Sequence, residues 1–439
     1  MAMMEKSKRR VLDIVFRSEI EPDSQGKHAS ADRQTSTGGK RSFLREAIAL
    51  ATIPLVLVLG NSMLIPVLPR MQKELDITQF QSSLTISLFS ISAGLFIPIL
   101  GYLSDRFTRK AIIIPSLIVY GGAGVLAGFG AIWESYAVVI AARAIQGLGA
   151  AGTAPIAMAL VGDMYQGGEE SKTLGLIEAS NGFGKVVSPI IGSVLALIVW
   201  YAAFFAFPVF CALSLIAVIW LIKEPERRTK PKKLKEYLQT IGDVLKKRGR
   251  WLITAFVAGS MGLFILFGAL FYLSQILEKD PYHIDGVVKG LILAIPLMGL
   301  VITSYTTGSI IKKNGLLIRW LMNIGLAVMT VSLASAIFLY DNIYLLITFL
   351  TLSAIGTGLL LPCLNTMITG SVARSERGMI TSLYSSLRFF GVAFGPPLFS
   401  WMMDRSDELV FIVTSALSLI TLAVVFFLIK PDRRLHEAS

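Results

Sequence analysis

Long apolar stretches alternate with short polar connections from about residue 46 to residue 430. A helix needs about 20 apolar residues to cross the hydrocarbon core of a membrane, and twelve stretches reach that scale. They cover residues 47–69, 82–103, 111–132, 135–163, 172–198, 201–222, 251–277, 286–311, 318–338, 343–370, 378–402 and 409–429. Most contain Gly or Pro, which spanning helices tolerate when neighbouring helices satisfy the freed backbone groups. The pattern predicts an all-α integral membrane protein with twelve transmembrane helices.

The polar segments divide the chain into five parts. We expect a disordered basic tail at 1–45, six-helix bundles at 46–222 and 251–430, a connection at 223–250 and a short tail at 431–439. Within the connection, apolar residues recur at helical spacing beside several lysines, which is typical of an amphipathic helix on an anionic membrane surface. A solvated charged linker is the alternative. The apolar positions are Leu234, Tyr237, Leu238, Ile241, Val244 and Leu245.

The two bundles repeat one another in sequence. One constant offset aligns Gly101 with Gly308, Gly149 with Gly356, Pro155 with Pro362, Gly184 with Gly391 and Pro189 with Pro396. An even number of helices in each half makes this a parallel repeat about an axis along the membrane normal. The sequence therefore predicts two pseudo-symmetric bundles.

Composition supports a membrane protein. Hydrophobic residues make up 54% of the 439 residues and charged residues only 16%, whereas a soluble domain carries roughly 25% charge. Such a chain cannot cover a water-facing surface, which excludes an ordinary soluble enzyme. Cys211 and Cys363 both lie in apolar stretches and predict neither a disulfide nor a metal site. No cofactor is expected.

The net charge of +12 is distributed unevenly along the chain. When the N-terminus is placed in the cytoplasm, most of the 41 Lys and Arg fall on that side. This asymmetry predicts a multi-pass protein of the plasma membrane with both termini in the cytoplasm. No folded basic domain suggests a nucleic-acid partner, so the expected partners are membrane lipid, a small-molecule substrate and protons, with the chain acting as a monomer. The outside loops then hold only Arg70, Lys73, Lys279, Lys289 and Arg405.

Three segments carry a family resemblance. Residues 101–110 read GYLSDRFTRK and resemble the signature loop G-x-L-x-D-R-x-G-R-K/R of the major facilitator superfamily, with Thr108 in place of Gly. Residues 143–151 resemble that family's R-x-x-Q-G-x-G-A motif. Residues 184–193 are similar to the antiporter motif G-x-x-x-G-P-x-x-G-G, with Ser188 and Ser193 in place of Gly. The resemblance implies the major facilitator fold and its twelve-helix drug/proton antiporter branch.

The signature loop supplies a predicted gate formed by Gly101, Asp105, Arg106, Arg109 and Lys110. Asp105 is expected to face the positive N-terminal end of the helix over 378–402, near Gly378, for about 0.3–2 kcal/mol. Arg109 and Lys110 can pair with Asp105 or with Asp163. The alternative is that these charges only enforce the topology.

The antiporter-like segment supplies a second predicted feature. Gly184, Pro189 and Gly192 allow the helix over 172–198 to bend and to pack closely between the halves. A purely structural role for these residues is the alternative.

Charged residues well inside the apolar stretches are few, and each is costly in hydrocarbon and tends to mark a pathway. They are Glu178 and the cations Arg143, Lys185 and Arg388. Glu178 is the preferred proton carrier, with Asp105 and Asp163 as further candidates, and a structural ion pair with Lys185 is the competing interpretation. The excess of cations predicts a preference for anionic or neutral substrates.

Each of these cations has an alternative interpretation, and so do the uncharged candidates. Arg143 could bond only helix ends and carbonyls, and Lys185 and Arg388 could extend toward the membrane surface. Further polar residues could line the same cavity, although hydrogen bonding between helices is as plausible for each. They are Asn61, Gln146, Asn181, Tyr272, Gln275, Asn365 and Tyr384.

The sequence predicts a secondary active transporter that works by alternating access. No nucleotide-binding P-loop pattern is present, so an ion gradient is the expected energy source. The resemblance implies proton-coupled export of an amphiphilic drug-like compound or metabolite. A transporter or flippase of an anionic solute or lipid is the first alternative, and a non-transporting membrane sensor is a remote one. An enzyme is not expected, because no His cluster, metal motif or G-x-S-x-G elbow occurs.

Overall fold

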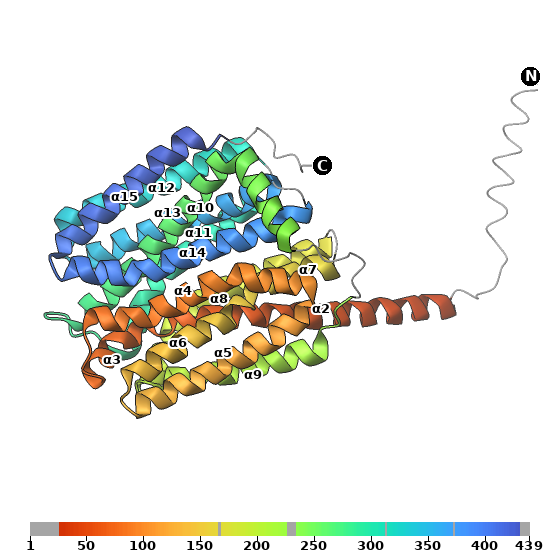
Figure 1. The fold of residues 1–439 in the computed structure, drawn as a ribbon, viewed down its shortest axis with the longest axis horizontal. Helices are drawn as coiled ribbons and strands as arrows, with labels where there is room; N and C mark the ends of the chain where they lie inside the picture. The colour runs from red at the N-terminus through yellow and green to blue at the C-terminus, as the bar shows by residue number, and fades with distance from the viewer. Residues whose placement is uncertain (1–25, 166–167, 226–233, 312–313, 372–373, 431–439) are drawn as a thin grey trace, which may run out of the picture. The chain divides into compact units, whose positions relative to one another are not determined.

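The computed structural model describes residues 26–165, 168–225, 234–311, 314–371 and 374–430 (Figure 1). The chain divides into two compact units, residues 1–47 and 48–439. In the first unit, residues 26–47 are helical and begin α2 (Gly26–Ser62). This start lies inside the predicted disordered tail, in a stretch that is free of the helix breaker Pro until Pro54. Residues 1–25 and the predicted tail at 431–439 lie outside the described residues.

The second unit is helical along nearly all of its described length. Each of the twelve predicted stretches coincides with one helix or with consecutive helices, which confirms the all-α fold; the stretch 135–163 is divided at Gly152 and Thr153. After the end of α2, the elements in chain order are η1 (Ile65–Val67), α3 (Leu68–Glu74), α4 (Gln79–Arg106), α5 (Arg109–Ile132), α6 (Tyr136–Ala151), α7 (Ala154–Met164), α8 (Gly168–Ala196), α9 (Ala202–Leu221), α10 (Leu234–Glu278), α11 (Gly286–Ile311), α12 (Gly315–Leu339), α13 (Ile343–Ser371), α14 (Arg374–Met403) and α15 (Asp407–Leu428).

The helices of the second unit form two bundles that face each other (Figure 1). The first bundle holds the part of α2 from residue 48 and the elements through α9, and the second holds α10 to α15. In the first bundle α5 packs on α6 and α9, and in the second the corresponding α12 packs on α13 and α15. Between the bundles α4 packs along α14, and α8 packs along α11.

The aligned glycines of the two bundles make the same kind of contact. Gly149 of α6 lies so close to α5 that an added Cβ would stand 2.6 Å from the Tyr120 nitrogen. Gly356 of α13 lies equally close to α12, where a Cβ would meet the Gly325 carbonyl oxygen. These matched approaches of backbone to backbone confirm the two pseudo-symmetric halves.

The helices at the interface between the bundles include the least apolar ones. Ten spans among the described residues are long and apolar enough to cross a membrane, and α8 and α14 are not among them. α8 carries Glu178 and Lys185, and α14 carries Arg377 and Arg388. Polarity is therefore concentrated on two of the four helices through which the bundles meet.

The described part of the connection between the bundles is helical from Leu234 and is continuous with the second bundle. From Leu234 onward it is the first part of α10, which runs without a break into the spanning segment that begins at Gly249. No Pro occurs between residues 234 and 278, so nothing in the backbone forces the helix to end at the membrane surface. Residues 226–233 lie outside the described residues, as do the side chains of Leu234 and Leu238.

We predict that Gly149→Ala and Gly356→Ala each lower the thermal stability of the purified protein. The added Cβ has to displace backbone atoms of α5 or α12, and such overpacking costs about 1–3 kcal/mol. Melting temperatures in detergent test this. Gly122→Ala is the matched control, because no atom lies within 4 Å of an added Cβ at this position of α5. Equal melting temperatures for all three variants would contradict the close packing.

Candidate functional site

The corner between α4 and α5 is organised by a helix cap. Thr108 stands where the signature loop of the family has Gly, and its side-chain oxygen accepts a hydrogen bond of 3.1 Å from the Ala111 nitrogen. Its backbone is extended, with φ of −113°, so this position does not need the conformational freedom of Gly. The departure from the family pattern therefore replaces a flexible residue by an N-cap, which stabilises the first turn of α5.

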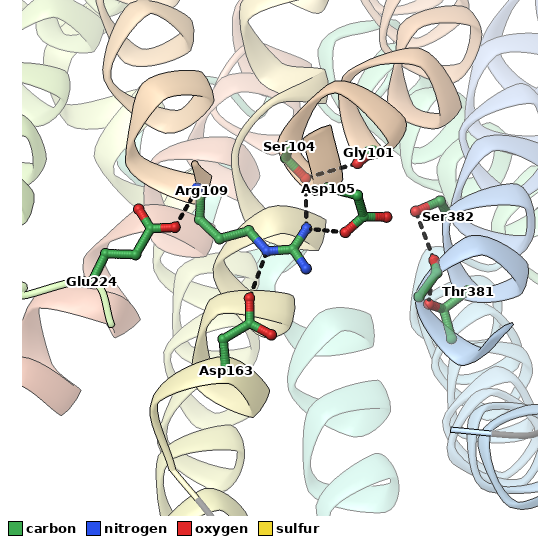
Figure 2. A network of polar contacts seen from close by, with 9 residues as sticks. Gly101, Ser104, Asp105, Arg109, Asp163, Glu224, Thr381 and Ser382 are labelled. Atoms are coloured by element: carbon green, nitrogen blue, oxygen red, sulfur yellow. Dashed lines mark hydrogen bonds and ion pairs between the residues drawn. The ribbon is translucent and has the colours of Figure 1, made fainter. Parts of the chain in front are cut away.

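Arg109 joins three helices at this corner (Figure 2). Its Nη1 lies 2.6 Å from Asp105 Oδ1 and donates to Ser104 Oγ at 2.7 Å, both at the end of α4. Its Nε donates to Asp163 Oδ2 at 2.8 Å, at the end of α7. The expected pairing of Arg109 with Asp105 or Asp163 thus occurs with both, because a planar guanidinium presents several donors in fixed directions. Arg106 is exposed.

Glu224, which the sequence analysis did not single out, holds the start of α5. Its two carboxylate oxygens accept the backbone N–H groups of Arg109 at 2.6 Å and Lys110 at 2.9 Å. A carboxylate is favoured there by the unpaired N–H groups and the positive end of the helix dipole. The Lys110 ammonium donates to the Ile222 carbonyl at 2.8 Å, and so caps the end of α9 instead of pairing with Asp105 or Asp163.

The corner also approaches the second bundle. A Cβ on Gly101 would lie 3.0 Å from Ser382 Oγ in α14, so Gly101 allows close contact between α4 and α14. Figure 2 shows Asp105 between Arg109 and the Ser382 side of α14. Ser382 and Thr381 bond the Gly378 carbonyl of their own helix, at 2.9 and 3.0 Å.

An aromatic pair adds a second contact between the bundles. The rings of Tyr102 in α4 and Tyr237 in α10 meet edge to face, with centroids 5.1 Å apart, and Tyr237 is only 8% exposed. Burial and, next, the nearby Asp105 carboxylate raise the pKa of the Tyr237 phenol, which therefore stays neutral. The extension of α10 thus packs against protein at the signature loop.

Arg143 forms a polar cluster inside the first bundle. Its side chain is 0% exposed and donates to the carbonyls of Thr85 at 2.9 Å and Gly60 at 3.1 Å. It also donates to the side-chain oxygens of Gln146 and Asn61. No carboxylate of the described chain bonds it, so carbonyl and amide oxygens satisfy this buried cation. The geometry is that of the alternative interpretation, in which Arg143 ties helices together.

The interface between the bundles brings two cations into electrostatic range of each other. Lys185 of α8 interacts with the charge of Arg388 on α14 and with that of Glu178 on its own helix. Within the described residues, neither cation forms an ion pair, and Arg388 lies 5.4 Å over the Tyr384 ring. Glu178 is exposed, which differs from the buried carboxylate expected from the sequence, and it forms no ion pair with Lys185 among the described residues.

The remaining candidates lie in different surroundings. Tyr272 packs edge to face on Phe411 of α15, within the second bundle. Tyr384 is buried and stacks on Phe256 of α10, and the buried Gln275 also belongs to α10. Asn181 and Asn365 are half-buried. The structure therefore joins Asn61, Gln146 and Arg143 in one cluster and does not bring the other uncharged candidates into it.

The antiporter-like segment of α8 makes contacts with both bundles. Gly184 packs against Leu55 of α2, and Gly192 packs against the Met63 carbonyl, both within the first bundle. The Pro189 carbonyl and Ser193 instead face α11 of the second bundle, where a Cβ on Gly290 would lie 2.8 Å and 2.6 Å from their oxygens. Close packing at the interface thus depends on Gly290, which the motif does not include.

Comparison with known proteins gives consistent matches. The family model described as Major Facilitator Superfamily matches residues 50–328 and 269–439. The bacillibactin exporter of Bacillus subtilis (strain 168) is 42% identical over 400 residues, which cover 90% of this chain and 99% of that protein. The multidrug efflux protein YfmO of the same organism is 27% identical over 382 residues, covering 86% and 91%.

Solved structures show the same fold. The human organic anion transporter MFSD10 aligns with a TM-score of 0.67 at 17% identity, covering 87% of this chain and 99% of that chain. The D-xylose–proton symporter aligns with a TM-score of 0.70 at 13% identity, covering 88% and 98%. At these identities the likeness concerns the fold alone.

We predict that Asp105→Asn slows transport while the protein still inserts and folds. Arg109 keeps its bonds to Asp163 and Ser104, so the corner remains assembled, but the carboxylate beside α14 loses its charge. Initial flux into liposomes and the melting temperature test this, with the exposed Asp76→Asn in the α3–α4 connection as the control. Wild-type flux from folded Asp105→Asn protein would contradict a gating role.

Proposed function

The chain belongs to the Major Facilitator Superfamily, and on that premise we propose that it is a proton-coupled exporter of a small amphiphilic molecule that carries negative charge, of the bacillibactin type. Its family and its exporter relatives make it a multi-pass membrane transporter and not an enzyme. The 42% identity over almost the whole bacillibactin exporter supports export and the kind of substrate.

The observation that carries the charge preference is that Lys185 of α8 and Arg388 of α14 lie within electrostatic range of each other. Arg143 is already satisfied by carbonyls inside its own bundle, which leaves two cations against the one carboxylate of Glu178. Like charges in a low-dielectric interface repel, so the bundles meet there at a cost. An anionic group between the two cations turns this repulsion into attraction and completes the pairing of both.

This arrangement links binding to movement. Lys185 lies on α8 of the first bundle, and Arg388 lies on α14 of the second. A bound anion is stabilised most when both cations reach it, which is when the bundles are drawn together. The substrate then has a higher affinity for the occluded state than for either open state, and only such a difference can shift the equilibrium between conformations.

The asymmetry of Lys and Arg along the sequence supports a cytoplasmic location for the α4–α5 corner and both termini. The opposite end of the second unit, where α10 ends and α11 begins, then faces outside. We propose that the chain works as a monomer in this orientation, with lipid around the bundles and protons as the coupling ion.

We predict that Lys185→Ala/Arg388→Ala reduces flux of a lipophilic anion by at least about tenfold, because each charge-assisted contact contributes roughly 1.5–3 kcal/mol. Flux of a lipophilic cation of matched size should not fall. Bacillibactin and such a matched pair are the probes, measured in liposomes with an imposed pH gradient. Lys172→Ala/Arg405→Ala removes two exposed cations of the same types and is the control. Strong cation flux that the interface double variant leaves unchanged would refute the charge preference.

We predict that Glu178→Gln abolishes accumulation driven by a pH gradient and spares exchange down a substrate gradient. Gln matches the side chain in size but does not bind and release a proton. Both fluxes are measured on the same reconstituted sample, with the exposed Glu169→Gln on the first turn of α8 as the control. If gradient-driven accumulation persists, the proton is carried elsewhere, and Asp105 and Asp163 become the carboxylates to test.

A further inference from the structure

The end of the second unit opposite the α4–α5 corner holds a buried lysine between the bundles. Lys289, in the first turn of α11, is 1% exposed. Its ammonium donates to the Pro66 carbonyl at 2.9 Å and to Glu278 Oε1 at 3.2 Å. Pro66 belongs to η1 of the first bundle, whereas Glu278 ends α10 of the second bundle. One ammonium therefore bonds both bundles at once.

Neighbouring contacts reinforce this connection. Ser274 of α10 donates to the Ile65 carbonyl at 2.8 Å, so side chains of the second bundle bond two consecutive carbonyls of η1. Glu278 Oε2 lies 3.8 Å from the Lys73 ammonium of α3, which adds a weaker attraction between the bundles. Gly290 follows Lys289 directly and lets α8 approach α11 at the same level.

We propose that Lys289 is the latch of the gate at this end, and that its bond to the Pro66 carbonyl holds the two bundles closed there. A buried ammonium is costly unless it is paired with an opposite charge and its N–H groups are hydrogen-bonded. In the closed state a carbonyl of the first bundle and a carboxylate of the second share this task. The bond to Pro66 breaks when the bundles separate, and the bond to Glu278 remains.

The retained partner is what makes the contact reversible. Lys289 and Glu278 lie in the same bundle, so they move together when the bundles separate. The ammonium then keeps its counter-charge while water replaces the Pro66 carbonyl. Opening removes one bond and leaves no buried charge unpaired, so the latch stabilises the closed state without locking it.

The test measures the opening directly and without substrate. Cys211 and Cys363 are replaced by Ala, and spin labels are placed at Trp133→Cys and Tyr344→Cys, two exposed positions at this end of the first and second bundles. Lys289→Met keeps an unbranched side chain of similar size and removes the ammonium. It should raise the ratio of the population at open distances to the population at closed distances roughly tenfold. Lys279→Met is the matched control, because Lys279 is an exposed lysine close by, and it should leave the ratio unchanged.

Exchanging the charges of Lys289 and Glu278 distinguishes the proposed latch from an ion pair that stabilises only the second bundle. Lys289→Glu/Glu278→Lys keeps opposite charges within that bundle, but a carboxylate cannot donate to the Pro66 carbonyl. It also places a new ammonium beside Lys73 of the other bundle. The exchanged protein should therefore be at least as open as Lys289→Met. Distances like those of the unexchanged chain would overturn the proposal, because the pair inside the bundle would then suffice.

Ser274→Ala is the variant least able to disturb folding, and it removes only one neutral bond between the bundles. It should shift the distances in the same direction by a smaller factor. Closed distances in both Ser274→Ala and Lys289→Met would also overturn the proposal. The inference rests on the alternating movement proposed above, but these distances need no substrate or pH gradient. A failure of the latch is thus distinguishable from a failure of the export proposal, which the flux assays test.

Discussion

A cation that is removed from water is costly unless oxygen atoms of the protein replace its hydration. The oxygen atoms near each interior cation therefore determine its role in this protein. Arg109 finds two carboxylates and joins three helix ends. Arg143 finds carbonyl and amide oxygens and ties the first bundle together. Lys289 finds a carbonyl of one bundle and a carboxylate of the other. Lys185 and Arg388 have no such oxygen partner among the described residues, and they lie on different bundles within electrostatic range of each other. The cations with oxygen partners thus stabilise the framework, whereas Lys185 and Arg388 are available to bind a ligand.

The sequence allowed the fold to be predicted well, because its signals are local. The apolar stretches predicted the helices, and the repeated Gly and Pro positions predicted the two similar halves. The pairing of Arg109 with Asp105 could also be predicted, because the two residues are only four positions apart and carry opposite charges. The contact between Glu224 and Arg109 could not be predicted in this way, because the two residues are 115 positions apart in the sequence. Only the packing of α9 beside α5 brings them together.

The sequence also did not reveal the surroundings of two other residues, for equally specific reasons. Lys289 was counted as a loop cation because it lies near the end of an apolar stretch, and nothing in its neighbourhood reveals the Pro66 carbonyl of the other bundle. Tyr272 was placed in the cavity because it is polar and interior, yet its ring turns toward Phe411. The position of a residue in a helix determines the face on which its side chain lies, but tertiary packing determines which residues contact that face.

The unbroken course of α10 has a mechanical consequence. About fifteen residues of this helix precede its spanning segment, which at 1.5 Å per residue gives a rod of roughly 20 Å. A stiff rod turns with the segment that it continues, so a tilt of about 15° inside the bilayer would displace its first turn, next to the Tyr237 ring that packs on Tyr102, by several ångströms. A tilt of the buried segment would therefore change the contact between the Tyr237 and Tyr102 rings, and a fluorophore attached near the start of α10 would respond to each transport cycle without entering the membrane.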